Sequence, residues 1–106
     1  GKLGVSWLNG SWRGIITTNA VISAGQIGWF ACVYNGTTTF TVYKNGSLVE
    51  ALTMSAAFVS NTQPLTINGA RNSGVTSGGM IGNQDEFAWF NAQLTAGQIT
   101  ALYEES

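Results

Sequence analysis

The sequence predicts an all-β, antiparallel β-sandwich with one short helix at its C-terminal end. Asn-Gly pairs stand between runs of β-favouring residues, which is the strongest short hairpin signal. The chain has 14 glycines, and only 8% of its residues are charged, against roughly 25% in ordinary soluble domains. Such a composition suits many tight turns. Helical spacing is confined to the last dozen residues.

The centre of the chain predicts a three-stranded meander. Strand-like runs at 29–34, 37–44 and 47–52 are separated by Asn35-Gly36 and by Asn45-Gly46. If both turns have two residues, the facing pairs are Tyr34 with Thr37, Trp29 with Val42, Lys44 with Ser47, and Val42 with Val49. A turn one residue longer would exchange the faces of one strand.

This register assigns the side chains of the meander to two faces. The expected core face carries Trp29, Ala31, Val33, Phe40, Val42, Val49 and Ala51. The expected half-exposed face carries Phe30, Cys32, Tyr34, Thr37, Thr39, Thr41, Tyr43, Leu48 and Glu50. Cys32, the single cysteine, is interpreted as a small buried hydrophobic residue.

Further elements flank the meander. A hairpin is expected from 5–8 and 12–17 around Asn9-Gly10, and short strands are expected at 64–67 and 85–90. Residues 68–79 read as a glycine-rich loop without periodicity. The predicted buried residues are Trp29, Val33, Phe40, Val42, Ile67, Phe87, Ile99 and Leu102.

The C-terminal helix is expected to begin after Thr95. Thr95 and Gln98 have the spacing of a capping box, and Leu94 and Ile99 that of a hydrophobic staple. The helix is too short to be stable alone, so it must pack on the sandwich.

Charge and composition exclude several function classes. The net charge is −1, and the four basic residues are scattered, so no cationic cluster for nucleic acid is present. No apolar run approaches the ~20 residues of a membrane span. The chain has no histidine, which excludes Ser-His and Cys-His nucleophile pairs.

An ordered series of motifs resembles the laminin-G-like branch of the concanavalin A-like lectin/glucanase superfamily. The matching pieces are Trp29, Tyr34 to Thr37, Thr41 to Gly46, Leu65 to Ile67, Gly82 to Glu86, Leu94 to Ile99, and Leu102-Tyr103. Asn35 stands in place of the usual Asp, and Asn68 in place of a usual Gly. The resemblance implies a concanavalin A-like jelly roll.

The resemblance also bears on domain organisation. It implies that residues 1–106 form one laminin-G-like domain lacking N-terminal strands of the full family domain. A homo-oligomer or a partner chain would then supply the missing strands, or residues 2–18 would fold back to do so, because an unpaired edge invites association.

Catalysis is not expected, and a metal ion is a secondary expectation. Asp85 and Glu86 are adjacent in a predicted strand, so their side chains would point to opposite faces rather than flank one glycosidic bond. Relatives often hold calcium, and the resemblance places Asp85 at the position of their carboxylate ligand. Calcium needs six to eight oxygens, several of them from the backbone.

Glycan binding is the sharper hypothesis. Sugars are held by aromatic platforms and a few oriented polar groups. The expected ligand-binding residues are Asn68, Arg71, Asn72 and Ser73 in the glycine-rich loop, with Tyr34 and Tyr43. Trp7, Trp12 and Trp89 are further candidates for half-exposed positions. Three Asn-Gly-Ser/Thr sequons, at Asn9, Asn35 and Asn45, coincide with predicted turns, and turn chemistry explains them without glycosylation.

These observations lead to one function hypothesis and one alternative. The first is a non-catalytic carbohydrate- or surface-binding module of a secreted or virion-surface protein. The alternative is a structural virion coat, decoration or tail component, or a filament subunit, completed by neighbouring chains. An enzyme remnant ranks third.

Overall fold

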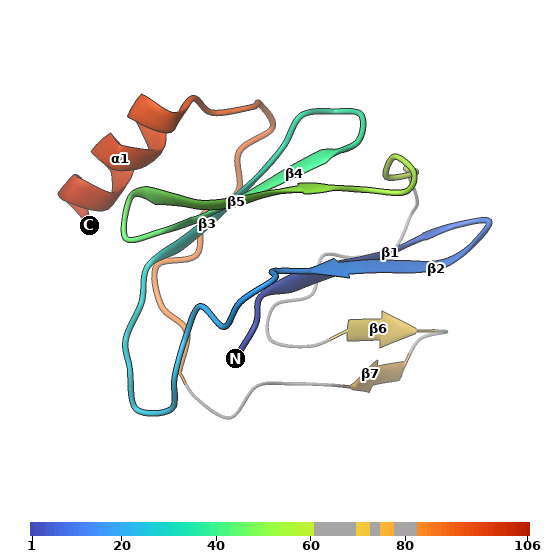
Figure 1. Cartoon of the computed structure of the whole chain (residues 1–106), viewed down its shortest axis with the longest axis horizontal. Helices are drawn as coiled ribbons and strands as arrows, with labels where there is room; N and C mark the ends of the chain where they lie inside the picture. The colour runs from blue at the N-terminus through green and yellow to red at the C-terminus, as the bar shows by residue number, and fades with distance from the viewer. Residues whose placement is uncertain (61–69, 73–74, 78–82) are drawn as a thin grey trace. The chain divides into compact units, whose positions relative to one another are not determined.

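A computed structural model describes residues 1–60, 70–72, 75–77 and 83–106 (Figure 1). The chain divides into two compact units, one of residues 1–59 and 92–106 and the other of residues 60–91. The first unit contains strands β1 (Gly4–Asn9), β2 (Ser11–Ile16), β3 (Phe30–Tyr34), β4 (Thr39–Lys44) and β5 (Ser47–Thr53), and helix α1 (Ala96–Glu105). The second contains the short strands β6 (Ala70–Asn72) and β7 (Val75–Ser77). Mostly antiparallel β structure with one short C-terminal helix confirms the predicted fold class at that level.

Strands β1 and β2 form the expected N-terminal hairpin around Gly10. The register pairs Asn9 with Ser11 and Trp7 with Arg13, and Gly10 at the tip has a φ of 72°. Glycine takes this left-handed conformation without steric cost. Side chains alternate along the hairpin, so Val5 and Trp7 turn to one face while Ser6 and Leu8 turn to the other.

The meander β3-β4-β5 forms as predicted, but its first turn is longer than two residues. Tyr34 pairs with Phe40 rather than with Thr37, and Cys32 rather than Trp29 pairs with Val42. The register differs by three residues, an odd number, so β4 exchanges its faces relative to β3. The predicted common core face of β3 and β4 is therefore wrong.

The second turn, at Asn45 and Gly46, has the predicted two residues and pairs Lys44 with Ser47. Asn45 and Gly46 have φ values of 50° and 79°, the positive values that the Asn-Gly pair predicts. Beyond Tyr43 a β-bulge shifts the register, so Val42 faces Glu50 instead of Val49. Val49 is 39% exposed, which contradicts its predicted place in the core.

Both faces of the meander are covered, each by a different element. On one face Phe40, Val42 and Leu52 pack with Trp7 of β1 and with Met54. On the other face Val33 and Tyr43 pack with Ile99 of α1, and Trp29 lies partly buried against them. Hairpin β1–β2 and helix α1 thus lie on opposite sides of the sheet (Figure 1).

The helix begins as the sequence predicts. Thr95 is the N-cap: its hydroxyl accepts a hydrogen bond from Gln98 N at 3.2 Å, and Gln98 Oε1 accepts one from Thr95 N at 2.9 Å. Leu94 packs against the cluster that contains Ile99, as the predicted staple requires. Ile99 is buried as predicted, whereas Leu102 is only half-buried.

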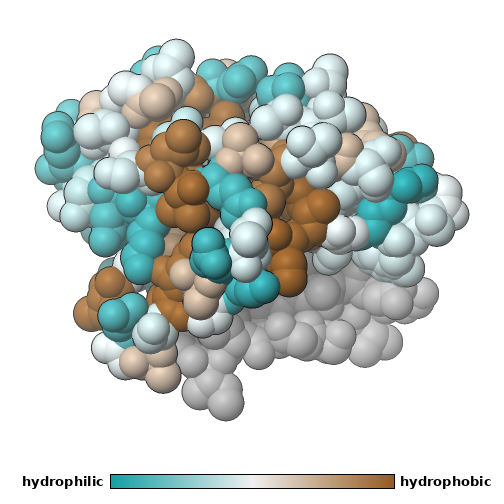
Figure 2. All heavy atoms as spheres, in the orientation of Figure 1, coloured by the Kyte–Doolittle hydropathy of each residue, from teal (hydrophilic) through white to brown (hydrophobic). Residues whose placement is uncertain are grey.

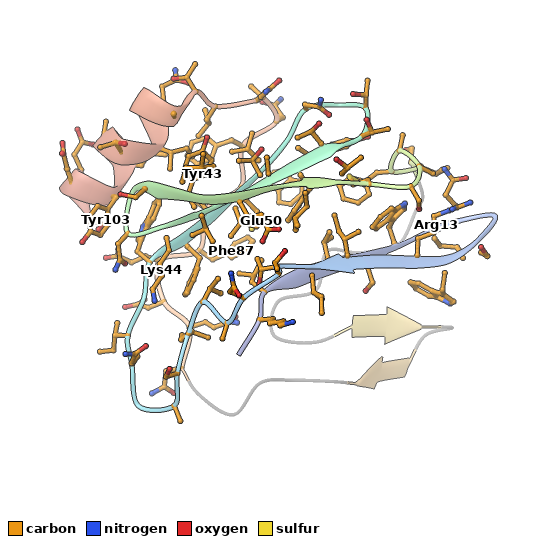
Figure 3. The ribbon with its side chains drawn as sticks, in the orientation of Figure 1. Arg13, Tyr43, Lys44, Glu50, Phe87 and Tyr103 are labelled. Carbon is orange, nitrogen blue, oxygen red and sulfur yellow. The ribbon has the colours of Figure 1, made fainter. Side chains whose placement is uncertain are left out.

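Polar contacts hold residues 17–29 against the sheet. Both carboxylate oxygens of Glu50 accept hydrogen bonds from Thr18, one from its amide at 2.8 Å and one from its hydroxyl at 2.7 Å. These hydrogen bonds lower the pKa of Glu50 below its ordinary value of 4.5, and the bond from the Thr18 hydroxyl has the largest effect. Lys44 Nζ donates to Val21 O at 2.5 Å (Figure 3). Glu50 and Lys44 therefore fix the connection between β2 and β3.

Three predictions for the second unit are wrong. Residues 85–90 do not form a strand, because Glu86 has a φ of 53°, which breaks an extended backbone. Phe87 is 56% exposed rather than buried. Part of the predicted 68–79 loop forms the hairpin β6–β7, with Arg71 facing Thr76. The predicted strand at 64–67 and the predicted core residue Ile67 lie outside the described residues.

Candidate functional site

One face of hairpin β1–β2 packs on the sheet, and the other, here called the outer face, carries exposed apolar side chains. Three facing pairs make up the outer face: Leu8 with Trp12 next to the turn, Ser6 with Gly14 in the middle, and Gly4 with Ile16 at the far end. Leu8, Trp12 and Ile16 are 54%, 56% and 60% exposed. These fractions are high for large apolar side chains on neighbouring strands, and grouped exposure of this kind is typical of interaction surfaces.

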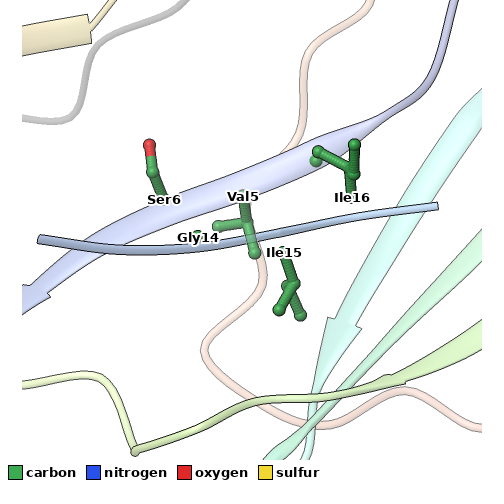
Figure 4. A pocket seen from close by; sticks show the side chains of 6 residues that line it. Val5, Ser6, Gly14, Ile15 and Ile16 are labelled. Atoms are coloured by element: carbon green, nitrogen blue, oxygen red, sulfur yellow. The ribbon is translucent and has the colours of Figure 1, made fainter.

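A shallow depression of about 380 Å³ lies at the end of the hairpin away from its turn, where it includes the Ser6–Gly14 and Gly4–Ile16 pairs of the outer face (Figure 4). Its lining is Gly4, Val5, Ser6, Gly14, Ile15 and Ile16. The depression exists because the central pair is small: Gly14 has no side chain, and Ser6 has only a hydroxymethyl group. Ile16 lines the depression, and Trp12, outside its lining, lies on the same face of β2 four residues away, about 13–14 Å along the strand. The outer face is therefore an elongated trough with apolar ends and a hydroxyl on its floor.

The two glycines of the trough have different roles. A Cβ on Gly4 would lie 2.5 Å from Ile16 Cγ2 and 2.7 Å from Ile15 O, so this position must be glycine for the strands to pair. A Cβ on Gly14 would meet nothing closer than Val5 O, at 3.6 Å. A side chain at position 14 is thus compatible with the hairpin and would fill the trough.

Comparison with known proteins gives one finding. Residues 1–100 match the laminin G family model described as the concanavalin A-like lectin/glucanases superfamily. The chain belongs to this superfamily. No curated protein and no solved structure matches the chain. The match confirms the resemblance and includes the N-terminal hairpin, which lies before the motifs at 29–103 that carried it.

Within this lectin/glucanase chain, the two predicted tyrosines have structural surroundings. The Tyr34 hydroxyl donates to Thr37 O at 3.0 Å and accepts from Phe58 N at 3.2 Å, and its ring lies 4.4 Å from that of Phe58. Tyr43 is 8% exposed and packs beside α1 (Figure 3). The expectation that Tyr43 is half-exposed is therefore wrong, whereas Tyr34 is half-exposed as predicted.

The three candidate tryptophans differ in their exposure to solvent. Trp7 is 6% exposed, which contradicts its predicted half-exposed position, whereas Trp12 on the partner strand is 56% exposed as predicted. Trp89, in the second unit, is 72% exposed. The structure therefore leaves Trp12 and Trp89 as exposed indoles.

The structure does not test the predicted polar ligand-binding residues. Asn68 and Ser73 lie outside the described residues. Arg71 and Asn72 belong to β6, where only the backbone is described. These four residues stay predictions.

Asp85 is exposed, and its Oδ1 accepts a hydrogen bond from Glu86 N at 2.9 Å. The described residues contain no group of three or more His, Cys, Asp or Glu that could hold a metal ion. Calcium ligation needs several converging oxygens, so the described carboxylates do not form such a site by themselves. A calcium ion at Asp85 stays a prediction.

Cys32 does not behave as the buried residue that the sequence predicts. It is exposed on strand β3, yet enough protein surrounds the thiol for desolvation to raise its pKa to about 11. The sulfur is therefore protonated at neutral pH and a poor nucleophile.

Two further findings concern the surface and the membrane. Among the described residues, no helix has both the length and the apolar character needed to span a bilayer. Apolar residues gather in clusters on the face shown in Figure 2, among more hydrophilic ones.

Proposed function

We propose that this chain is a non-catalytic carbohydrate-binding module of a secreted or virion-surface protein, and that it holds glycan in the trough of the outer face. The observation that carries the proposal is the exposed Trp12 beside a glycine-floored depression, in a chain of the lectin/glucanase superfamily. Laminin-G-like domains are typically extracellular, which supports the proposed location.

The chemistry of the trough matches that of a neutral saccharide. A pyranose ring has an apolar C–H face that stacks on an indole, and its edge carries hydroxyls that need hydrogen-bond partners. Trp12 supplies the indole, Ser6 a hydroxyl, and Ile16 a second apolar contact at the far end. None of the described residues that line the depression is ionisable, so an uncharged glycan is favoured over an acidic one.

The elongated shape indicates the kind of glycan. The two apolar ends are separated by more than one sugar ring, so a short stretch of an oligosaccharide would contact both. Asn68, Arg71, Asn72 and Ser73, in the second unit, stay predicted ligand-binding residues.

Screening the whole chain against an array of neutral and acidic oligosaccharides, followed by calorimetric titration of the best ligand, tests the proposal. Trp12→Ala is expected to weaken binding about tenfold, corresponding to about 1.4 kcal/mol. Gly14→Val should have a similar effect by filling the depression. Trp89→Ala, which removes an even more exposed indole elsewhere, is the control and should leave affinity unchanged.

Two results would contradict this site. If no array glycan is bound, the carbohydrate function itself fails. If a glycan is bound and Trp12→Ala and Gly14→Val both retain wild-type affinity, the function stands and the trough is not the site.

The alternative, a structural subunit completed by neighbouring chains, is favoured by the same exposed side chains. Leu8, Trp12 and Ile16 would be buried at a subunit interface, and Ile27, which is fully exposed, is a further apolar contact point. Analytical ultracentrifugation over a dilution series distinguishes the two functions. An oligomer that dissociates on Trp12→Ala would support assembly, and a monomer at all concentrations would support glycan binding.

A further inference from the structure

Three Asn-Gly pairs within the described residues form turns, and their asparagine side chains have different surroundings. Asn9, Asn35 and Asn45 are each followed by glycine and then by a hydroxyl residue, so their local sequences are nearly the same. Any difference in the chemistry of the three amides must therefore come from the fold.

Asn35 has the most polarised side-chain carbonyl of the three. Its Oδ1 accepts hydrogen bonds from Thr37 N at 2.9 Å, Thr37 Oγ1 at 3.0 Å and Thr39 N at 3.0 Å. Its side-chain amide nitrogen has no hydrogen-bond partner among the described residues. A Cβ placed on Gly36, whose φ is 86°, would meet no atom within 4 Å, so the turn has free space around it.

The other two asparagines are held in ways that oppose reaction. Asn45 Oδ1 accepts one hydrogen bond, from Trp29 N at 3.0 Å, and the next residue, Gly46, lies directly under Tyr103 of α1. Asn9 Oδ1 accepts none from the described residues, and its Nδ2 donates to Ala57 O at 3.0 Å. The three side chains thus receive three, one and no hydrogen bonds on Oδ1.

We propose that Asn35 is a site of self-catalysed deamidation. The backbone nitrogen of Gly36 loses its proton to solvent and bonds to Asn35 Cγ. The Cγ–Nδ2 bond breaks, and Nδ2 takes up one proton from solvent and leaves as ammonia. Water then opens the resulting succinimide to aspartate or isoaspartate, so one water is consumed and one ammonia is released.

The three donors around Oδ1 favour this reaction for a definite reason. Oδ1 becomes negatively charged as the glycine nitrogen adds to Cγ, and donors already placed around an oxygen stabilise such a charge in the transition state. Gly36 has no side chain to obstruct the approach, and the open surroundings leave room for the ring. The turn at Gly46 has less free space, because a Cβ there would meet Tyr103. Gly10 is as open as Gly36, so at Asn9 the difference lies in the donors around Oδ1.

The product changes the loop. Aspartate would take the net charge from −1 to −2 and would accept the same three donors, as charge-assisted hydrogen bonds. Isoaspartate lengthens the backbone by one carbon and would disrupt them. The modification goes beyond the proposed glycan function and does not depend on it.

The three sites provide internal controls within one molecule. The native chain is incubated in mildly alkaline buffer, and each turn peptide is followed by peptide mapping with mass spectrometry. Asn35 is expected to deamidate on the order of tenfold faster than Asn45 and Asn9, because preorganised donors act strongly on a developing oxyanion. In denaturing urea the three rates should converge.

A pair of variants isolates the donors. Thr37→Val removes the hydroxyl that donates to Asn35 Oδ1 and should slow deamidation of Asn35 roughly two- to tenfold, the effect of one net hydrogen bond. Thr38→Val makes the same change one residue along and should have no effect. In both variants the deamidation rate of Asn45 serves as a check on folding, because unfolding would raise that rate.

The proposal is overturned if Asn35 in the native chain reacts no faster than Asn45 and Asn9. It is overturned as well if Asn35 is fastest but Thr37→Val, with Asn45 still slow, leaves its rate unchanged. The deamidation rates of the three asparagines in the native chain therefore test the proposal even without a variant.

Discussion

The turn at Asn45 and Gly46 carries the C-terminal helix as well as reversing the chain, and Gly46→Ala tests both roles. Gly46 O accepts a hydrogen bond from Thr100 Oγ1 at 2.9 Å. A Cβ on Gly46 would lie 2.8 Å from Tyr103 Cδ1, 3.1 Å from its Cβ and 3.2 Å from its Cγ. Because the base of the tyrosine is involved, the helix itself would have to move.

Two costs add at this position. A side chain in the left-handed conformation, required by the φ of 79°, costs about 1–2 kcal/mol. Displacing the helix costs about 1–3 kcal/mol, the usual range for overpacking. The expected loss of unfolding free energy is therefore about 2–5 kcal/mol.

Gly36→Ala is the matched control, because Gly36 has a φ of 86° but open space around it. It should lose only the backbone contribution, about 1–2 kcal/mol. Urea denaturation, followed by tryptophan fluorescence and far-UV circular dichroism, measures both losses. Adding Tyr103→Ala to Gly46→Ala should recover part of the packing cost in a double-mutant cycle. Equal losses for the two glycine variants would refute the packing of α1 on this turn.

Two further predictions concern the core and the pH dependence of stability. Phe40→Ala should cost about 3–5 kcal/mol in urea denaturation, since Phe40 is 8% exposed at the centre of the Trp7 cluster; a loss below about 1 kcal/mol would contradict that packing. The folded-state pKa of Glu50 is lowered, so its hydrogen bonds with Thr18 stabilise the fold above the ordinary pKa of 4.5, and this stability is lost as the pH falls through the folded pKa. Thermal unfolding from neutral to acidic pH should accordingly show a steeper loss for the wild type than for Glu50→Gln, and identical curves would count against the Thr18 contact.

Local chemistry made several features predictable. The capping box of Thr95 and Gln98 and the two-residue turn at Asn45-Gly46 depend on neighbours within four residues, so the sequence is sufficient to place them. The family could also be inferred, because an ordered series of motifs survives errors in any single element.

The register of the meander strands could be established only from the tertiary structure. Asn35 and Asn45 precede glycine alike, yet the Asn35 side chain captures the amides of Thr37 and Thr39, which lengthens its turn and exchanges the faces of β4. The bulge that displaces Val49 adds a second shift. Periodicity alone does not reveal these shifts, because each moves whole strands by an odd number of residues.

The candidate site likewise combines features that the sequence predicts with features that only the structure shows. The sequence identifies Trp12 and Trp7 alike as half-exposed candidates, but pairing about Gly10 places them on opposite faces of the hairpin. The trough also requires Ser6 to face Gly14, and this strand register could not be predicted from the residue types. By itself the sequence determined the composition, the caps, the tightest turn and the family. Only the tertiary structure decided which aromatic rings are buried in the core and which face solvent, because burial depends on long-range strand pairing.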